Sequence, residues 1–311
     1  MLVALTGGTG GAKLIQGLSL EVDPDALVVV CNTADDFVLH GLYISPDLDT
    51  ITYTLAGMGD TTKGWGIKDD TFAALEWLGR YGGETWFKLG DRDLATHITR
   101  SRFLSEGLSL SQVTERLRKS LGVKAVIIPM SDDRVETRIV TPKGEIPFQD
   151  FFVKERWAAE VKEISFVGAE RSQPAPGVID AIQEAAAVII CPSNPATSIG
   201  PILAVPGIRA ALKKTEAPVL AVSPIIQGAP VNGPAHKLMA AMGFEVSAFG
   251  VAKAYADFLD MILVAPEDRG LQERIKELGV RTVATSIHMH SLTDKRRLAR
   301  EVLALVRGSC S

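Results

Sequence analysis

Short apolar runs rich in β-branched residues recur along this chain, and they constrain its fold more than any other feature. They cover residues 2–5, 27–31, 124–128, 187–191, 218–222, 261–264 and 281–284. Because each run is apolar on both faces, it is typical of a strand in a parallel sheet that is buried on both sides. Amphipathic segments separate most of the runs. The alternation predicts a three-layer α/β fold in which helices cover both faces of a mostly parallel, Rossmann-like sheet.

The last amphipathic segment shows the clearest helical period. We expect its apolar stripe to face the sheet, and this stripe consists of Leu298, Val302, Leu305 and Val306. We expect its polar residues on the opposite, exposed face, and these are Asp294, Lys295, Arg296 and Arg300.

One stretch interrupts the alternation, because residues 50–121 contain no convincing strand. Two apolar stripes at helical spacing lie there. The first consists of Phe72, Leu75 and Leu78, and the second of Leu110, Val113, Leu117 and Leu121. We expect Gly122 to cap the C-terminus of the second helix. We therefore divide the chain into a Rossmann-like domain, residues 1–49 and 122–311, and a helical insertion, residues 50–121. Alternating β-type residues over 134–148, around a turn at 141–144, predict a hairpin appended to the sheet.

The composition narrows the possible partners and location. The 311 residues include 33 Lys and Arg against 37 Asp and Glu, a formal net charge of −4, with neither sign concentrated along the chain. We therefore expect no nucleic-acid or membrane-surface partner. The cysteines, Cys31, Cys191 and Cys310, form no C-x-x-C pair and predict neither a disulfide framework nor a zinc site. Without a basic leader or a membrane-length apolar run, we expect a cytoplasmic protein.

A glycine-rich loop, Thr6–Lys13, follows the first predicted strand and opens the first predicted helix. Glycines let backbone N–H groups approach an anion, and the helix N-terminus favours negative charge. We predict that a phosphate chain binds to Gly8, Thr9, Gly10, Gly11 and Lys13. The pattern is neither a P-loop nor the dinucleotide fingerprint, because Lys13 stands where the latter has its third glycine. The alternative is a glycine-rich turn that binds no ligand.

Two acidic segments follow the second predicted strand. They contain the candidate Mg²⁺ ligands Asp35, Asp36, Asp47 and Asp49, together with the polar residue Asn32. Carboxylates at the end of a strand, beside a phosphate loop, suit a metal that bridges phosphate oxygens. The alternative is that Asp35 and Asp49 cap turns and helices.

Three further segments carry polar groups. Trp86–Asp93 could hold a planar polar ligand, although Asp91 or Asp93 could instead cap the helix near residues 94–103 and Trp86 could be core. The loop 192–201 could contact a base or a second phosphate through Ser193, Asn194, Thr197, Ser198 and Gly200, or could be a proline-stiffened connector. Asn32, after the second predicted strand, is also predicted to bind the nucleotide. His288 and His290 have no third ligand and are interpreted as loop residues.

Five ordered blocks together resemble the 2-phospho-L-lactate transferase family of deazaflavin coenzyme biosynthesis, over nearly the whole chain. They are Gly7–Lys13, Asn32–Asp36, Pro46–Thr50, Lys88–Asp93 and Ser193–Pro201. The resemblance implies transfer of a phospholactyl or phosphoenolpyruvyl group from a guanosine-diphosphate-linked donor to the ribityl hydroxyl of 7,8-didemethyl-8-hydroxy-5-deazariboflavin, releasing GMP. It also implies dependence on Mg²⁺.

The same resemblance assigns roles to residues of both parts of the chain. Deazaflavin contacts are expected at Asp49, Lys88 and Asp91, so the helical insertion contributes to the acceptor site. Many relatives have arginine at the position of Lys88, and the guanidinium of arginine can form a bidentate contact that lysine cannot. Lys13 and Asp49 are the expected catalytic residues. Lys13 would neutralise the diphosphate, while Asp49 would orient or deprotonate the hydroxyl or hold the metal, and the sequence does not separate these roles.

Two other classes of protein share parts of this pattern. A non-catalytic, nucleotide-sugar-binding regulator of the same superfamily has the glycine loop and an Asp-Asp segment, but Phe37 and the block 88–93 favour the enzyme. A nicotinamide-dependent oxidoreductase conflicts with the broken dinucleotide fingerprint. For the oligomeric state we expect a homodimer, because this is the commonest assembly.

Overall fold

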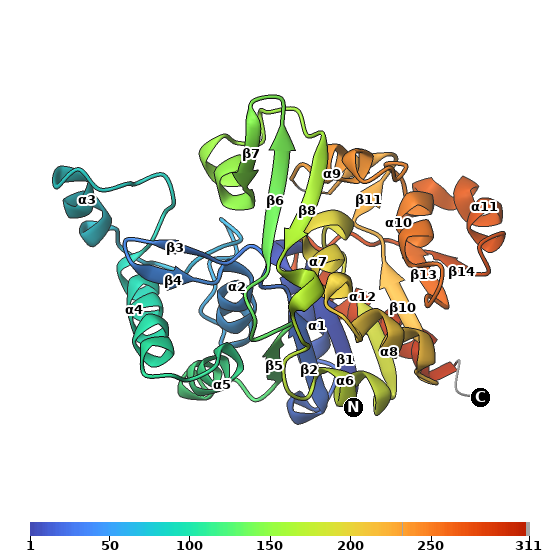
Figure 1. Ribbon diagram of the computed structural model, residues 1–311. Helices are drawn as coiled ribbons and strands as arrows, with labels where there is room; N and C mark the ends of the chain where they lie inside the picture. The colour runs from blue at the N-terminus through green and yellow to red at the C-terminus, as the bar shows by residue number, and fades with distance from the viewer. Residues whose placement is uncertain (232, 309–311) are drawn as a thin grey trace.

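The central layer is a parallel sheet of seven strands. A computed structural model describes residues 1–231 and 233–308, and Cys310 lies outside them. In spatial order the strands are β14 (Arg281–Ala284), β13 (Met261–Val264), β10 (Val219–Val222), β9 (Ala187–Ile190), β1 (Leu2–Thr6), β2 (Leu27–Cys31) and β5 (Val126–Pro129). Every neighbouring pair is parallel. Each of the apolar runs therefore forms one strand, and the predicted Rossmann-like sheet is confirmed (Figure 1).

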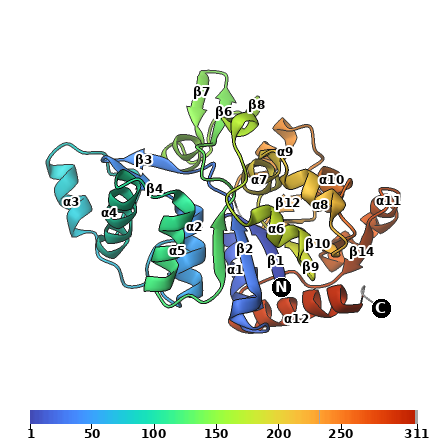
Figure 2. The same cartoon turned by 60° about the horizontal axis from the view of Figure 1, so that its bottom comes forward.

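Helices cover both faces of this sheet, because alternate strand residues point to opposite sides. Ala4 packs in one core with α1 (Gly8–Ser19), α2 (Pro46–Leu55), α5 (Leu110–Ser120) and α12 (Leu292–Gly308). Val3 and Leu5 pack in the other core with α6 (Val178–Gln183), α7 (Gly200–Ala204), α8 (Ile208–Lys214), α9 (Ala235–Ala241), α10 (Ala248–Tyr255) and α11 (Gln272–Lys276). Figure 2 shows α12 next to α1, across the bottom of the view, on the first of these faces.

The last helix confirms the predicted apolar stripe and corrects one polar residue. Leu298, Val302 and Val306 are buried against the sheet. Arg296 and Arg300 lie outside and pair with Glu21 at 2.6 and 2.8 Å. Lys295, however, is only 8% exposed, so its expected place on the solvent face is wrong. It lies against α1, one helical position away from the exposed residues.

The chain between β2 and β5 forms a lobe beside the sheet. It begins with a hairpin of β3 (Phe37–Leu39) and β4 (Leu42–Ile44), which the sequence did not signal because each strand has only three residues. Helices α2, α3 (Ala73–Arg80), α4 (Asp91–Ser105) and α5 follow, so the predicted boundary at residue 50 lies inside α2. The predicted cap is present, since Gly122 has φ of 71° and its N–H donates to the Lys119 carbonyl at 3.0 Å.

The predicted hairpin at 134–148 exists but does not join the central sheet. Strands β6 (Glu136–Thr141) and β7 (Gly144–Pro147) pair antiparallel, with the turn at the predicted position. Strand β8 (Glu163–Val167) pairs with the other edge of β6, and together they form a separate three-stranded sheet above the central one (Figure 1). A short helical segment, Asp150–Lys154, follows β7, and a further small hairpin joins β11 (Ile225–Ile226) to β12 (Ala229–Pro230).

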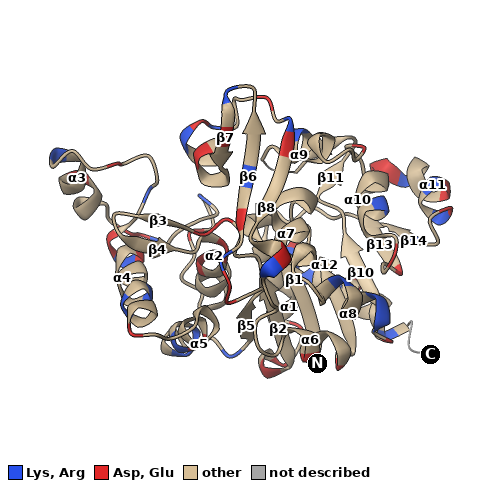
Figure 3. Cartoon of the chain, viewed as in Figure 1, with Lys and Arg blue, Asp and Glu red and all other residues tan. Residues whose placement is uncertain are grey.

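The outer surface carries both charge signs. Figure 3 shows Lys and Arg mixed with Asp and Glu over outer elements such as α4 and α11. Among the described residues, no helix has the length and apolar character needed to cross a bilayer.

Candidate active site

A cavity of about 510 Å³ opens at the carboxyl ends of the parallel strands. The segments that follow β1, β2, β9, β10 and β14 all contribute to its walls, as expected for ligand sites in open α/β sheets. Most predicted site residues line it, namely Gly8, Thr9, Gly10, Lys13, Asp35, Asp47, Asp49, Lys88, Ser193, Asn194, Thr197 and Ser198. The remaining predicted residues, Gly11, Asn32, Asp36, Asp91 and Gly200, are not part of its lining.

The glycine loop presents the N-terminus of α1 to this cavity. Helix α1 begins at Gly8 without a side-chain cap from Gly7, so backbone N–H groups of its first turn are directed at the cavity end. The Gly8 N–H donates to Asp47 Oδ1 at 2.8 Å, and Lys13 lines the cavity. The Gly7 N–H donates to Ser193 Oγ at 3.2 Å, which connects this loop to the segment after β9. The geometry suits a phosphate chain at the end of α1.

Gly10 is required for the close approach of these two loops. A Cβ atom at Gly10 would lie 2.4 Å from the carbonyl oxygen of Pro192. We expect Gly10→Ala to lower the melting temperature and to weaken GDP binding at least about tenfold, although alanine favours a helix by about 1 kcal/mol over glycine. Gly270→Ala is the control, since a Cβ there meets nothing within 4 Å. Thermal melting and calorimetry check this, and equal behaviour of both variants would contradict it.

Asn32 holds two of the predicted metal-binding carboxylates side by side. Its Nδ2 donates to Asp35 Oδ2 at 3.1 Å and to Asp47 Oδ2 at 3.0 Å, while its Oδ1 accepts from the Ala34 N–H at 3.0 Å. Asn32 is fully buried and contacts these neighbours without lining the cavity. The second oxygen of Asp35, Oδ1, is buried without a hydrogen-bond partner.

This carboxylate pair is electrostatically unfavourable without a cation. Burial raises the pKa of Asp35 well above its ordinary value, and the neighbouring Asp47 raises it further. Burial also raises the pKa of Asp47, against the lowering effect of the bonds from Asn32 and Gly8. No cationic side chain forms an ion pair with either carboxylate within the described part of the chain. A hard cation would relieve both effects.

Asp36 and Asp49 do not belong to this pair. Asp36 Oδ2 accepts from Ser45 Oγ at 2.7 Å, away from the cavity lining. Asp49 lines the cavity, but its carboxylate accepts from both terminal nitrogens of Arg100, with Oδ2 at 3.0 Å from Nη1. Arg100 is 2% exposed. The four predicted metal ligands therefore fall into different environments.

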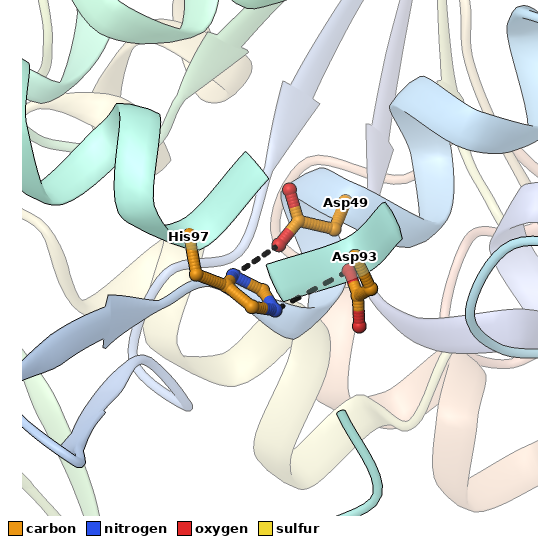
Figure 4. A group of neighbouring side chains, drawn as sticks. All are labelled: Asp49, Asp93 and His97. Atoms are coloured by element: carbon orange, nitrogen blue, oxygen red, sulfur yellow. Dashed lines mark ion pairs between the residues drawn. The ribbon is translucent and has the colours of Figure 1, made fainter. Parts of the chain in front are cut away.

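Asp49 and Arg100 continue into a buried polar network with residues of α4. His97 Nδ1 lies 3.2 Å from Arg100 Nη1 and 3.6 Å from Asp49 Oδ2, and His97 Nε2 lies 3.3 Å from Asp93 Oδ1. Figure 4 shows His97 between the carboxylates of Asp49 and Asp93. Tyr53 OH donates to Asp93 Oδ1 at 2.8 Å. A guanidinium only donates, so His97 Nδ1 accepts from Arg100. Asp49, Asp93 and His97 also place ligand atoms within 4.8 Å of one another.

The sequence analysis missed His97 and Arg100, and it named Asp93 only within the polar segment 86–93 and as a possible helix cap. Asp93, His97 and Arg100 follow a spacing of four and three residues, which places them on one face of α4. This polar stripe was the sequence feature that could have indicated the buried network. It was not interpreted in that way, because a polar face on a helix is usually exposed to solvent.

The residues of the segment 86–93 have different structural roles. Lys88 lines the cavity and is exposed, and Trp86 packs with Phe37 in a small apolar cluster, at 5.8 Å between ring centroids. Asp91 accepts from the N–H groups of Ala73 and Ala74 at 3.1 and 2.9 Å, which caps α3 and not the helix that was expected. Helix α4 is capped in turn by Asp70, which accepts from Arg92 and Asp93 N–H groups. The carboxylate of Asp91 is thus already engaged.

The segment after β9 is more regular than the expected loop. Pro195–Ile199 forms a π-helical turn, and α7 begins at Gly200. Gly200 packs against Pro195 and Phe166, where an added Cβ would lie 3.0 and 3.1 Å from their atoms. Ser193, Asn194, Thr197 and Ser198 remain at the cavity.

Several lining residues had no signal in the sequence. The stretch 148–157 after β7 contributes Phe148, Phe152, Arg156 and Trp157, and the rings of Phe152 and Trp157 lie 5.4 Å apart. His288 and His290, interpreted as loop residues, also line the cavity, with stacked rings at 5.4 Å. The cavity lining therefore combines aromatic side chains with the polar glycine loop, which fits a ligand with both a charged and a planar part.

Comparison with known proteins gives consistent matches over the whole chain. The family model described as 2-phospho-L-lactate transferase CofD matches residues 2–303. A phosphoenolpyruvate transferase of Streptomyces griseus is 46% identical over 313 residues, covering 98% of this chain and 98% of that protein. A 2-phospho-L-lactate transferase of Methanosarcina mazei is 43% identical over 302 residues, covering 97% and 99%.

One solved structure extends the comparison of the fold. It is a member of the UPF0052 family from Bacillus halodurans, which matches with a TM-score of 0.64 and 18% identity over 97% of this chain and 98% of that one. At this identity the likeness concerns the fold alone.

Proposed function

This chain belongs to the 2-phospho-L-lactate transferase CofD family and is a transferase, and on that premise we propose its donor, acceptor and product. The proposed reaction moves a phospholactyl or phosphoenolpyruvyl group from a guanosine-diphosphate-linked donor to the ribityl hydroxyl of 7,8-didemethyl-8-hydroxy-5-deazariboflavin. GMP is released. The observation that carries the proposal is the single cavity in which the N-terminus of α1, Lys13 and the paired carboxylates Asp35 and Asp47 meet an aromatic wall.

The donor's phosphates fit the glycine loop. Backbone N–H groups at the start of α1 and the ammonium of Lys13 supply positive potential where the diphosphate would lie. Ser193 and Thr197, from the opposite loop, supply hydroxyl groups at the same edge. A diphosphate carries charge that must be neutralised during transfer, so this arrangement favours the transition state through positioning and electrostatics.

Mg²⁺ fits the carboxylate pair of Asp35 and Asp47 better than the group formed by Asp49, Asp93 and His97. Asp35 and Asp47 offer hard oxygen ligands, and Asp35 Oδ1 is a buried oxygen without a partner. In the other group, Arg100 already occupies Asp49 and donates to His97, and its positive charge repels a cation. We therefore assign Asp35 and Asp47 as the residues that would hold Mg²⁺. When bound, the ion would neutralise phosphate oxygens.

The acceptor's hydroxyl is assigned to the side of the cavity where Asp49, Asp93 and Lys88 lie. Both oxygens of Asp49 accept from Arg100, so this carboxylate orients the hydroxyl and does not take its proton. The planar ring system fits the aromatic wall of Phe152 and Trp157. The cytoplasmic location and the homodimer remain predictions.

Release of GMP from the purified protein tests this function. We expect turnover only when the deazaflavin and a guanosine-diphosphate-linked donor are both present, and assays with the lactyl and the enolpyruvyl donor identify which group is transferred. EDTA should abolish turnover, and Mg²⁺ should restore it. Absence of deazaflavin-dependent GMP release with either donor would contradict the proposal.

Nucleotide binding gives a second test of the same site. We expect GDP to bind more tightly than ADP, because a site with buried polar groups discriminates against the wrong hydrogen-bond pattern. Lys13→Ala should weaken GDP more than guanosine, since only GDP presents phosphates to the ammonium. Calorimetry measures both, with guanosine as the control ligand. Equal affinities for GDP and ADP would remove the guanosine assignment.

A further inference from the structure

A second, smaller cavity of about 90 Å³ lies beside the phosphate loop. Residues of α1, α2, α12 and the segment 57–66 line it, and it shares Thr9, Lys13, Thr50, Trp65 and Gly66 with the main cavity. It is much smaller than the main cavity, about 90 Å³ against about 510 Å³, so it suits a compact ion better than a nucleoside. Whatever it binds lies next to the end of the phosphate loop.

Lys295 enters this small cavity from α12 with its charge unpaired. Helices α1 and α12 approach closely at Gly17, where an added Cβ would lie 2.2 Å from the Lys295 carbonyl oxygen. This packing leaves Lys295 8% exposed. Its Nζ donates to Gln16 Oε1 at 2.7 Å, and throughout the described residues it has no ion pair with a carboxylate. Burial and the charge of Lys13 both lower the pKa of Lys295.

The carboxylate of Asp60, in the wall of this small cavity, is already paired with a cation. Asp60 lies 3.2 Å from Lys63 Nζ and accepts from the N–H groups of Thr62 and Lys63 at 2.9 and 3.0 Å. Lys13 and Lys295 therefore give the cavity a surplus of positive charge. Burying an ammonium group is unfavourable unless an opposite charge accompanies it, so the surplus is complementary to an anion.

We propose that this small cavity is a second anion-binding subsite, in which Lys295 and Lys13 hold a compact oxyanion beside the phosphate loop. The oxyanion comes either from a phosphate group of the bound nucleotide or from free inorganic phosphate. Gln16 holds the ammonium of Lys295 in place. The inference concerns binding to the free protein and does not depend on the acceptor or on group transfer.

Titration of the full-length protein with inorganic phosphate tests the subsite. Lys295→Met keeps the length of the side chain but removes its charge, and we expect it to weaken phosphate binding at least about tenfold and to remove the rise in melting temperature that phosphate causes. Arg307→Gln is the matched control, because Arg307 is an exposed cation on the same helix. That variant should bind phosphate like the wild type.

GDP and guanosine separate the two sources of the oxyanion. If Lys295→Met weakens GDP but not guanosine, and phosphate competes with GDP, the subsite holds a nucleotide phosphate. If the variant loses phosphate while GDP binding is unchanged, the subsite holds a free anion. Both outcomes support an oxyanion subsite.

The proposal is overturned if Lys295→Met matches the wild type in both the phosphate and the GDP titrations. Thermal melting without anions shows whether the variant folds, and Lys295→Gln replaces it if the methionine variant does not. Lys295→Arg should restore anion binding, which a purely structural role would not predict. Because donor and acceptor are absent, failure of the proposed transfer reaction would not affect these results.

Discussion

Asp35→Asn is expected to lower the Mg²⁺-dependent transfer rate by about 10²-fold or more while making the metal-free protein more stable. Loss of one charged group that stabilises the transition state usually has this effect on kcat. The stability gain follows from burial, because Asp35 is held beside Asp47 with one oxygen unpartnered. Stability and activity are therefore opposed at this residue.

The raised pKa of Asp35 determines how the stability of the metal-free protein changes with pH. The pKa of Asp35 is raised in the folded state, so between the ordinary value of about 3.9 and the raised value the folded protein binds more protons than the unfolded chain. The free energy of unfolding therefore falls as pH rises through this window, and Asp35→Asn should remove this part of the fall. Added Mg²⁺ should reduce the same slope in the wild type only.

Asp268→Asn is the control for this experiment. Asp268 is also a buried aspartate whose pKa is raised by burial, but it accepts from the Gln227 N–H and does not line the cavity. Its variant should change the pH dependence of stability without loss of transfer activity. Thermal melting over a pH series and the GMP-release assay measure both quantities. Full Mg²⁺-dependent activity in Asp35→Asn would contradict its assignment as a metal ligand.

Arg100→Met is expected to lower the free energy of unfolding by about 3–5 kcal/mol, the usual effect of breaking a buried ion pair. The change leaves Asp49 charged and buried without its partner. Asp49→Asn should also destabilise, since it leaves Arg100 unpaired. Activity of any Asp49 variant must therefore be measured relative to the folded fraction.

A double-mutant cycle separates the ion pair from packing. The variant with both Asp49→Asn and Arg100→Met carries no unpaired charge, so its destabilisation should be well below the sum of the single effects. The exposed pair Arg80 and Glu76, 2.6 Å apart on α3, is the control and should contribute less than about 1 kcal/mol. Urea denaturation gives each value. If Arg100→Met shifted the midpoint no more than Arg80→Met, the buried pair would have no special role.

The sequence predicts where the site lies, but it does not predict which of its side chains contact one another. Loops after strands are local features, and parallel strands bring their carboxyl ends to one edge, so the glycine loop, the acidic segments and the segment after β9 could be predicted to meet there. Which groups touch within that edge depends on distances between segments far apart in the chain. Asn32 between Asp35 and Asp47 is one such case, and Arg100 on Asp49 is another.

The sequence by itself determined the strands, the two covered faces and the glycine-rich turn that begins α1, because apolar runs and glycine patterns act through short-range physics. Only the tertiary structure decided which charged residues are buried. Lys295 shares a helix with exposed arginines, yet close packing at Gly17 places it against α1. Asp91, expected at the ligand, caps α3 because Asp70 caps α4 in its place. Such outcomes depend on which neighbour each charge meets after the chain has folded, and no local pattern encodes that partner.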